Sequence, residues 1–131
     1  MKEYTLDASV LIPRPIAEVF EFFSDAANLE RFTPPFLNFK IATPLPIRMC
    51  VGATLEYTIT LHGIAIRWKT NISAWNPPHR FVDEQIQGPY RLWVHEHTFH
   101  QARDGVVMRD FVRYAIPGGP LAPLIHRMFV R

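Results

Sequence analysis

The feature that most constrains the fold is a series of runs in which polar and apolar residues alternate, separated by short turn signals. Side chains of a β-strand point to opposite faces in turn, so this alternation predicts half-buried strands. Turns are predicted at residues 76–79, 88–90 and 104–105, where proline, glycine, asparagine and aspartate gather. Connections this short join antiparallel strands, so we expect a continuous antiparallel meander. The expected strands cover residues 4–12, 36–41, 55–61, 64–75, 81–87, 91–101 and 106–116.

Helical spacing replaces alternation in two places. After the first strand, Pro13-Arg14-Pro15 opens a segment whose apolar residues share one helical face. These residues are Ile16, Val19, Phe20 and Phe23. Ser24 or Asp25 can cap a second short helix, and residues 121–131 show helical spacing again. We therefore predict an α+β fold: a strongly curved antiparallel sheet of about seven strands, two short helices after the first strand, and a C-terminal helix over the concave face.

Composition bounds the class of protein. The 131 residues fit one domain, 1–131, and 48% hydrophobic content supports a folded core. The net charge is +2 without a basic run, which argues against a nucleic-acid partner. Cys50 is the single cysteine, so an internal disulfide is excluded. No apolar run reaches the roughly 18 residues of a membrane span, and the N-terminus lacks the apolar core of a signal peptide. We expect a cytoplasmic protein, and its oligomeric state stays open.

The run Trp93-Val94-His95-Glu96-His97-Thr98-Phe99 carries the main functional signal. Alternation places two histidines on one face, bracketed by two aromatic residues. If the strands pair in order, this face collects apolar and polar side chains suited to a ligand pocket. The predicted ligand-binding residues are Tyr57, Trp68, Phe81, Asp83, Gln85, Trp93, His95, His97, Phe99, Met108, Asp110 and Tyr114. A filled core is the simpler explanation for the aromatics alone, but five polar side chains in a sealed core would be costly.

The two histidines allow three interpretations. With Asp110 or Asp83 as a third ligand, His95 and His97 could bind a metal ion. Alternatively, His95, His97 and Asp110 could act as general acid and base, since imidazole titrates near neutral pH. In the third interpretation, which we favour, the histidines hydrogen-bond a polar group of a ligand. We expect no metal and no cofactor. We also expect His97→Ala to weaken ligand binding more than it destabilises the fold.

Several segments resemble a known superfamily over essentially the whole chain. They are residues 15–25 (Pro-Ile-Ala-Glu-Val-Phe-Glu-Phe-Phe-Ser-Asp), residues 28–34 (Asn-Leu-Glu-Arg-Phe-Thr-Pro), and residues 76–85, 88–90 and 93–99. The first two segments are similar to the START-like, birch-pollen-allergen-like and polyketide cyclase/dehydrase proteins of the SRPBCC superfamily. The last three resemble a bacterial subgroup of it with largely unassigned function. The resemblance implies the helix-grip fold. The final helix, residues 121–131, is shorter than is usual there, so it is either naturally short or truncated.

Three functional hypotheses follow. The first is a binding protein for a small hydrophobic or aromatic molecule, held in a cavity between the sheet and the C-terminal helix. The second is a cyclase, dehydratase or isomerase that uses His95, His97 and Asp110. The third is an interaction module with a vestigial pocket. The resemblance does not choose among them, because one fold hosts many functions.

Overall fold

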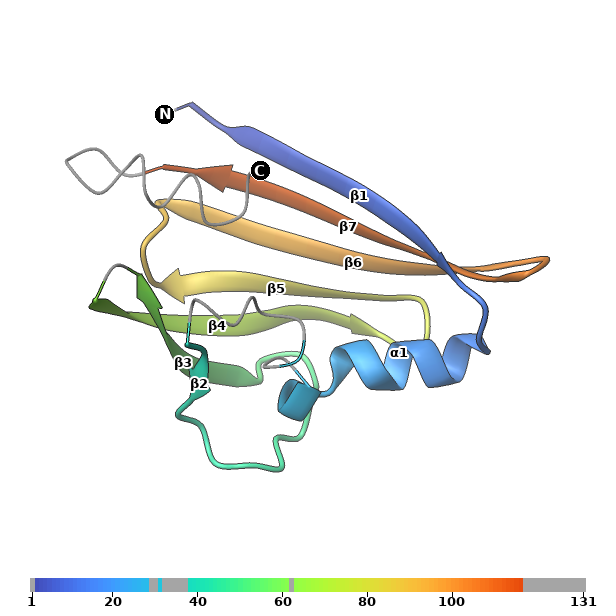
Figure 1. Ribbon diagram of the computed structural model, residues 1–131, viewed down its shortest axis with the longest axis horizontal. Helices are drawn as coiled ribbons and strands as arrows, with labels where there is room; N and C mark the ends of the chain where they lie inside the picture. Colours follow the sequence, from blue (N-terminus) through green and yellow to red (C-terminus); the bar gives the residue numbers. More distant parts are fainter. Residues whose placement is uncertain (1, 29–30, 32–37, 62, 117–131) are drawn as a thin grey trace.

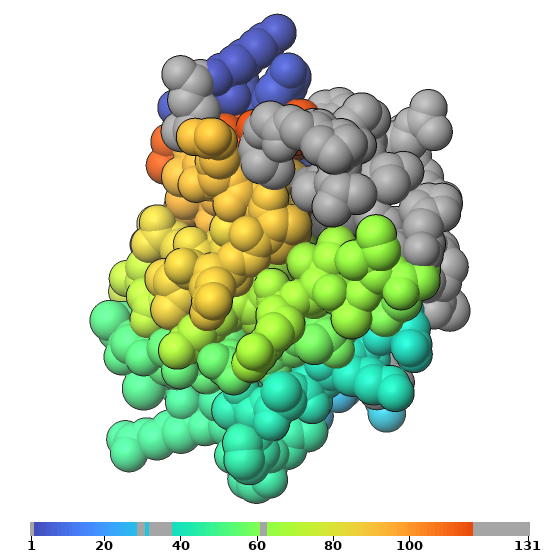
Figure 2. Space-filling model, turned by 90° about the vertical axis from the view of Figure 1, so that its left-hand side faces the viewer, coloured from blue at the N-terminus to red at the C-terminus, as the bar shows by residue number. Residues whose placement is uncertain are grey.

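The computed structural model describes residues 2–28, 31, 38–61 and 63–116 and contains one antiparallel sheet. Its seven strands lie in the order β1-β7-β6-β5-β4-β3-β2 and form a curved sheet (Figure 1). Figure 2 shows the same order from the side, from β1 and β7 at the top to the segment around β2 at the bottom. The strands are β1 (Tyr4–Ile12), β2 (Lys40–Ile41), β3 (Thr54–Leu61), β4 (Ile64–Asn76), β5 (Arg80–Gln87), β6 (Leu92–Ala102) and β7 (Gly105–Ala115).

The predicted antiparallel sheet is confirmed, and most strand bounds agree within one or two residues. Each of β3 to β7 pairs with its sequence neighbour, as the short turns require. The exception is β1, which crosses to the far edge and pairs with β7, so that Leu6 lies opposite Val112 and Ala8 opposite Asp110. This long-range pairing brings the start of the described chain beside its last strand.

Helix α1 (Ile16–Ser24) lies across one end of the sheet (Figure 1). Its first turn follows Pro15, whose carbonyl accepts a hydrogen bond from the Val19 amide at 3.1 Å. Val19 and Phe20 are buried, and the Phe20 ring packs edge-on against Phe99 of β6. The predicted apolar face of this helix is therefore confirmed, and it covers the cluster of Phe81, Phe99, Val106 and Met108.

After α1 the described chain forms a single 3₁₀ turn, η1 (Ala26–Asn28). The Asp25 carboxylate accepts a hydrogen bond from the Ala27 amide at 2.9 Å, so Asp25 is the capping residue. The rest of the predicted second helix and the start of the predicted second strand fall largely outside the described residues. The predicted C-terminal helix, residues 121–131, also lies outside them. In the described part of the chain, no helix is long and apolar enough to cross a membrane.

Two aromatic residues near strand ends, Trp75 and Tyr90, pack into the core. The pairing of β4 with β5 shifts between Ile72 and Ala74, and this irregularity turns Trp75 inward against Phe20. Tyr90 is only 4% exposed, because the Gln85 side chain binds its backbone amide and carbonyl at 3.1 and 2.6 Å. Alternation predicts neither this register shift nor the hydrogen bonds of Gln85, so the inward positions of Trp75 and Tyr90 do not follow from the local pattern.

Candidate functional site

Strand β6 supplies the centre of the site, and its two neighbours supply the partners. The alternation of β6 directs His95 and His97 to the same face as Trp93 and Phe99. In the pairing of β5 with β6, Asp83 lies opposite His95. In the pairing of β6 with β7, Asp110 lies opposite His97. Each histidine therefore has a carboxylate directly beside it on one neighbouring strand and another diagonally across on the other.

These four residues, Asp83, His95, His97 and Asp110, form what we call the His–Asp cluster. The Nε2 atom of His97 lies 2.6 Å from Oδ2 of Asp83, and its Nδ1 lies 3.0 Å from Oδ1 of Asp110. The Nε2 atom of His95 lies 3.0 Å from the same Asp110 oxygen, and its Nδ1 lies 4.0 Å from Asp83 Oδ2. Both imidazoles thus face both carboxylates, and the cluster links the three adjacent strands β5, β6 and β7.

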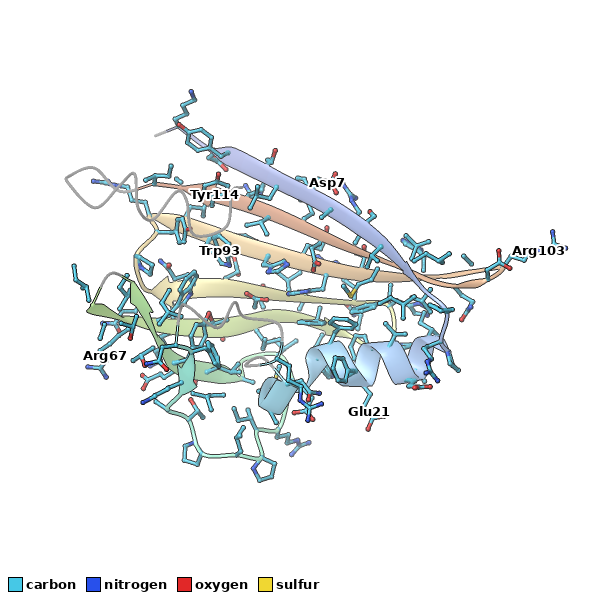
Figure 3. The ribbon with its side chains drawn as sticks, viewed as in Figure 1. Asp7, Glu21, Arg67, Trp93, Arg103 and Tyr114 are labelled. Atoms are coloured by element: carbon cyan, nitrogen blue, oxygen red, sulfur yellow. The ribbon has the colours of Figure 1, made fainter. Side chains whose placement is uncertain are left out.

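The two imidazole rings are also stacked. Their centroids lie 3.7 Å apart with an interplanar angle of 25°. On its other side, His97 stacks against Phe81 at 4.0 Å and 11°. The edge of the stack meets Trp93, which lies T-shaped to His95 at 6.2 Å. Trp93 in turn neighbours Tyr114 on β7 (Figure 3). The stack packs the two rings between Phe81 and Trp93.

Burial and hydrogen bonding oppose each other in the titration of the cluster. Burial by itself lowers the pKa of His97, but the hydrogen bonds with Asp110 and Asp83 outweigh it and raise this pKa to about 9. Burial likewise favours protonated carboxyl groups, yet the hydrogen bonds with the histidines hold the pKa values of Asp83 and Asp110 below the ordinary value. At neutral pH, His97 is therefore an imidazolium that donates one hydrogen bond to each of two carboxylates.

The His–Asp cluster borders a cavity of about 520 Å³ between the sheet and the α1–η1 segment. This volume lies within the range of about 300–1,000 Å³ that is typical of small-molecule sites. Its described walls are mainly apolar, and the charged residues that line it are the His–Asp cluster together with Asp7 and Asp25. Among the predicted site residues, those that line the cavity are Tyr57, Trp68, Phe81, Asp83, Trp93, His95, His97, Met108 and Asp110.

Three predicted site residues lie elsewhere. Gln85 is engaged with the backbone of Tyr90, Phe99 is fully buried in the cluster beneath α1, and Tyr114 stacks against Tyr4. These residues share the correct face of their strands, but they lie toward the ends of the sheet, beyond the hollow part. Alternation identifies the face of a sheet and not the position of a cavity along it.

Other lining residues were missed by the sequence analysis. Those from the sheet include Leu6, Ala8, Leu55, Ile59, Thr70, Ile72 and Val112, and α1 adds Phe23 and Ser24. On β3, β4 and β7, alternation places the missed residues on the same face as Tyr57, Trp68 and Asp110, so the sequence contained a signal for them. For β1 that signal was insufficient, because Leu6 and Ala8 reach the cavity only through the pairing of β1 with β7.

Tyr57 adds a further polar group to the cavity wall. Burial and the negative charge of Asp83 raise the pKa of Tyr57 well above its ordinary value, so its phenol stays protonated. A protonated phenol can donate a hydrogen bond to a ligand oxygen. Separately, Asp83, His95 and His97 each offer one ligand atom to a metal ion, and these atoms lie within 4.8 Å of one another.

Comparison with known proteins supports a single family. The profile of the family described as "Polyketide cyclase / dehydrase and lipid transport" matches residues 12–131. A search of curated proteins found no match. Among solved structures, protein CV1439 from Chromobacterium violaceum superposes with a TM-score of 0.74 at 14% identity, covering 96% of this chain and 89% of that protein.

Two further structures show the same likeness. Protein TTHA0849 from Thermus thermophilus superposes with a TM-score of 0.69 at 15% identity, covering 95% of this chain and 83% of that protein. The di-domain ARO/CYC protein BexL, from the BE-7585A biosynthetic pathway, superposes with a TM-score of 0.69 at 17% identity. The superposition covers 94% of this chain and 39% of BexL. At such identities the likeness establishes the fold alone.

Proposed function

Because the chain belongs to the family described as polyketide cyclase / dehydrase and lipid transport, we propose that it binds a small hydrophobic or aromatic molecule in the cavity beside the His–Asp cluster. The observation that carries this proposal is the cavity of about 520 Å³, whose described walls come from aromatic and aliphatic side chains of both the sheet and α1. A space of this size would accommodate a molecule of several fused or linked rings. Burial of such a molecule is favoured by the apolar area removed from water.

The polar groups would orient the bound molecule. Tyr57 can donate a hydrogen bond from its protonated phenol, and the carboxylate oxygens of Asp83 and Asp110 can accept hydrogen bonds. A ligand with a hydroxyl or carbonyl group at one end and an apolar body fits this division. A ligand with a carboxylate at that end does not, because it would face two negative side chains. We place this activity in one cytoplasmic domain, a setting that suits a protein whose single cysteine is Cys50.

The test is to look for a bound molecule and then to refill the cavity. Native mass spectrometry of freshly purified protein should detect a retained organic molecule that is released on denaturation. The emptied protein should then bind the neutral dye N-phenyl-1-naphthylamine with one site per chain, and the extracted molecule should displace it. Protein that carries no molecule and takes up no dye would instead support an interaction module with a vestigial pocket.

A second candidate function is that of a cyclase, dehydratase or isomerase. It is favoured by one observation: Asp110 contacts both imidazoles within 3.0 Å, and all three groups border the cavity. Such groups could move protons on a bound ring system. BexL is described as an ARO/CYC protein, which makes hydroxylated, polyketide-like rings the first substrates to try. Asp110→Asn keeps the shape of the side chain, so loss of turnover with unchanged dye binding would identify this function.

A further inference from the structure

We propose that Asp83, His95 and His97 bind a divalent transition-metal ion, with Zn²⁺ as the best-suited ion, and that the remaining coordination position opens into the cavity. Two imidazoles and one carboxylate are a donor set that zinc uses in proteins, with a fourth position left for water or a ligand. The proposal concerns a different ligand from the apolar molecule above, so either proposal can fail while the other holds.

The spacing of the three ligand atoms is close to that of a zinc site. Zinc bonds of about 2.0–2.2 Å in a tetrahedral arrangement place neighbouring ligand atoms about 3.3 Å apart. Oδ2 of Asp83 lies 2.6 Å from Nε2 of His97 and 4.0 Å from Nδ1 of His95. One possible ligand atom from each of the three residues lies within 4.8 Å of the other two. Side-chain movements below about 1 Å would therefore bring the two separations from Asp83 to the value that zinc requires.

Asp110 supplies an independent indication, because it contacts the opposite edge of both rings. The nitrogens that face Asp83 are Nδ1 of His95 and Nε2 of His97. The other nitrogens, Nε2 of His95 and Nδ1 of His97, each lie 3.0 Å from Oδ1 of Asp110. Histidines that bind metals in proteins usually donate their second N–H to a carboxylate or carbonyl, which fixes the ring and its tautomer. A single carboxylate does this here for both rings.

Charge and burial also agree with a divalent ion. The side chains of Asp83, His95 and His97 are 19%, 22% and 15% exposed, so an ion here would lose most of its water. An ion in such a place needs charge compensation. The ion would replace the Nε2 proton of His97, which is released to water. With both imidazoles then neutral, the carboxylates of Asp83 and Asp110 together balance the charge of a divalent ion. A metal lies in the plane of each imidazole it binds, so loading must fan the rings out of their 25° stack, and the adjoining cavity leaves space for this.

The full chain is first stripped of metal with a chelator and dialysed. It is then titrated with Zn²⁺, followed by calorimetry, and with Co²⁺, followed by visible absorption. We expect one ion per chain and the intense Co²⁺ absorption of a four-coordinate site. His95→Ala, His97→Ala and Asp83→Asn should abolish the Co²⁺ band, and Asp110→Asn should weaken Zn²⁺ binding by about 10–100-fold. His100→Ala is the matched control, because His100 is exposed on the same strand, and it should bind like the parent.

Circular dichroism and dye uptake in the presence of chelator check that each variant folds and keeps its cavity. If a histidine variant fails to fold, Asp83→Asn and Asp110→Asn, which preserve side-chain shape, still decide the question. The proposal is overturned if the parent shows no saturable Zn²⁺ uptake, if Co²⁺ gives only the weak absorption of six-coordinate ions, or if uptake persists in the Asp83 and histidine variants. Loss of dye binding in the metal-free parent would count against the proposed apolar ligand and not against the metal site.

Discussion

His97 on β6 donates a hydrogen bond from Nε2 to Oδ2 of Asp83 on β5 across 2.6 Å, although its paired residue on β5 is Phe81. The hydrogen bond is therefore diagonal, and the imidazole stacks on the ring of Phe81 beside it. The same ring reaches Asp110 on the other neighbouring strand. His97 thus places a positive charge between two partly buried carboxylates that would otherwise repel each other. This relationship determines how the removal of His97 should affect stability.

We expect His97→Ala to destabilise the protein by about 2–3 kcal/mol at neutral pH, because it leaves two partly buried carboxylates without their shared cation. This revises the expectation from the sequence, in which the variant affected binding more than stability. Urea unfolding measures the change, and His100→Ala serves as the control. Adding Asp83→Asn to the His97→Ala variant removes one unpaired charge and should restore part of the loss. An additive double variant, with no restored stability, would show that the coupling is absent.

The metal-free protein should lose stability between about pH 6.5 and pH 9. His97 has a folded-state pKa of about 9, above its unfolded value of 6.5, so the folded state holds this proton more tightly. Its contribution is fully present below pH 6.5 and is lost as pH rises through 9. The loss should be on the order of 1–3 kcal/mol in urea unfolding with chelator present. His97→Ala should abolish this slope and His100→Ala should keep it; a flat profile in the parent would contradict the assignment.

Ala8→Trp should weaken binding of the naphthylamine dye at least about tenfold, because Ala8 lines the cavity and a large ring there occupies the space of the ligand. Ala65→Trp makes the same change at another exposed strand position that is not among the described lining residues. It should leave the dye affinity unchanged. Fluorescence titration compares the two variants. Equal affinities for both would mean that the dye binds outside this cavity.

Gly105→Ala should destabilise the protein by about 2 kcal/mol or more, since two costs combine at this position. Gly105 has φ +150°, and an added Cβ would collide with the backbone carbonyl of Ile12, where β1 meets β7. Gly63→Ala is the comparison, because Gly63 has φ +80° and open space where an added Cβ would lie. It should cost only about 1 kcal/mol of backbone strain. Thermal unfolding of both variants separates the collision from the strain; equal losses would show that the collision is relieved cheaply.

Much of this protein could be predicted from local patterns. Alternation has a period of two and depends only on neighbours in sequence, so it placed His95 and His97 on one face with Trp93. Helical spacing identified the face of α1 that covers the core, for the same reason. The carboxylates of Asp83 and Asp110 could be named as partners because short turns force the central strands to pair in order.

What the tertiary structure alone decided depends on contacts between distant parts of the chain. The pairing of β1 with β7 brought Leu6 and Ala8 into the cavity wall, and no local signal specifies that pairing. The register shift in β4 turned Trp75 inward, because one irregular residue reverses every side chain that follows it. The diagonal bonds of the His–Asp cluster depend on the relative register of three strands. Alternation therefore determined which side chains share a face, and only the assembled sheet determined which of them touch.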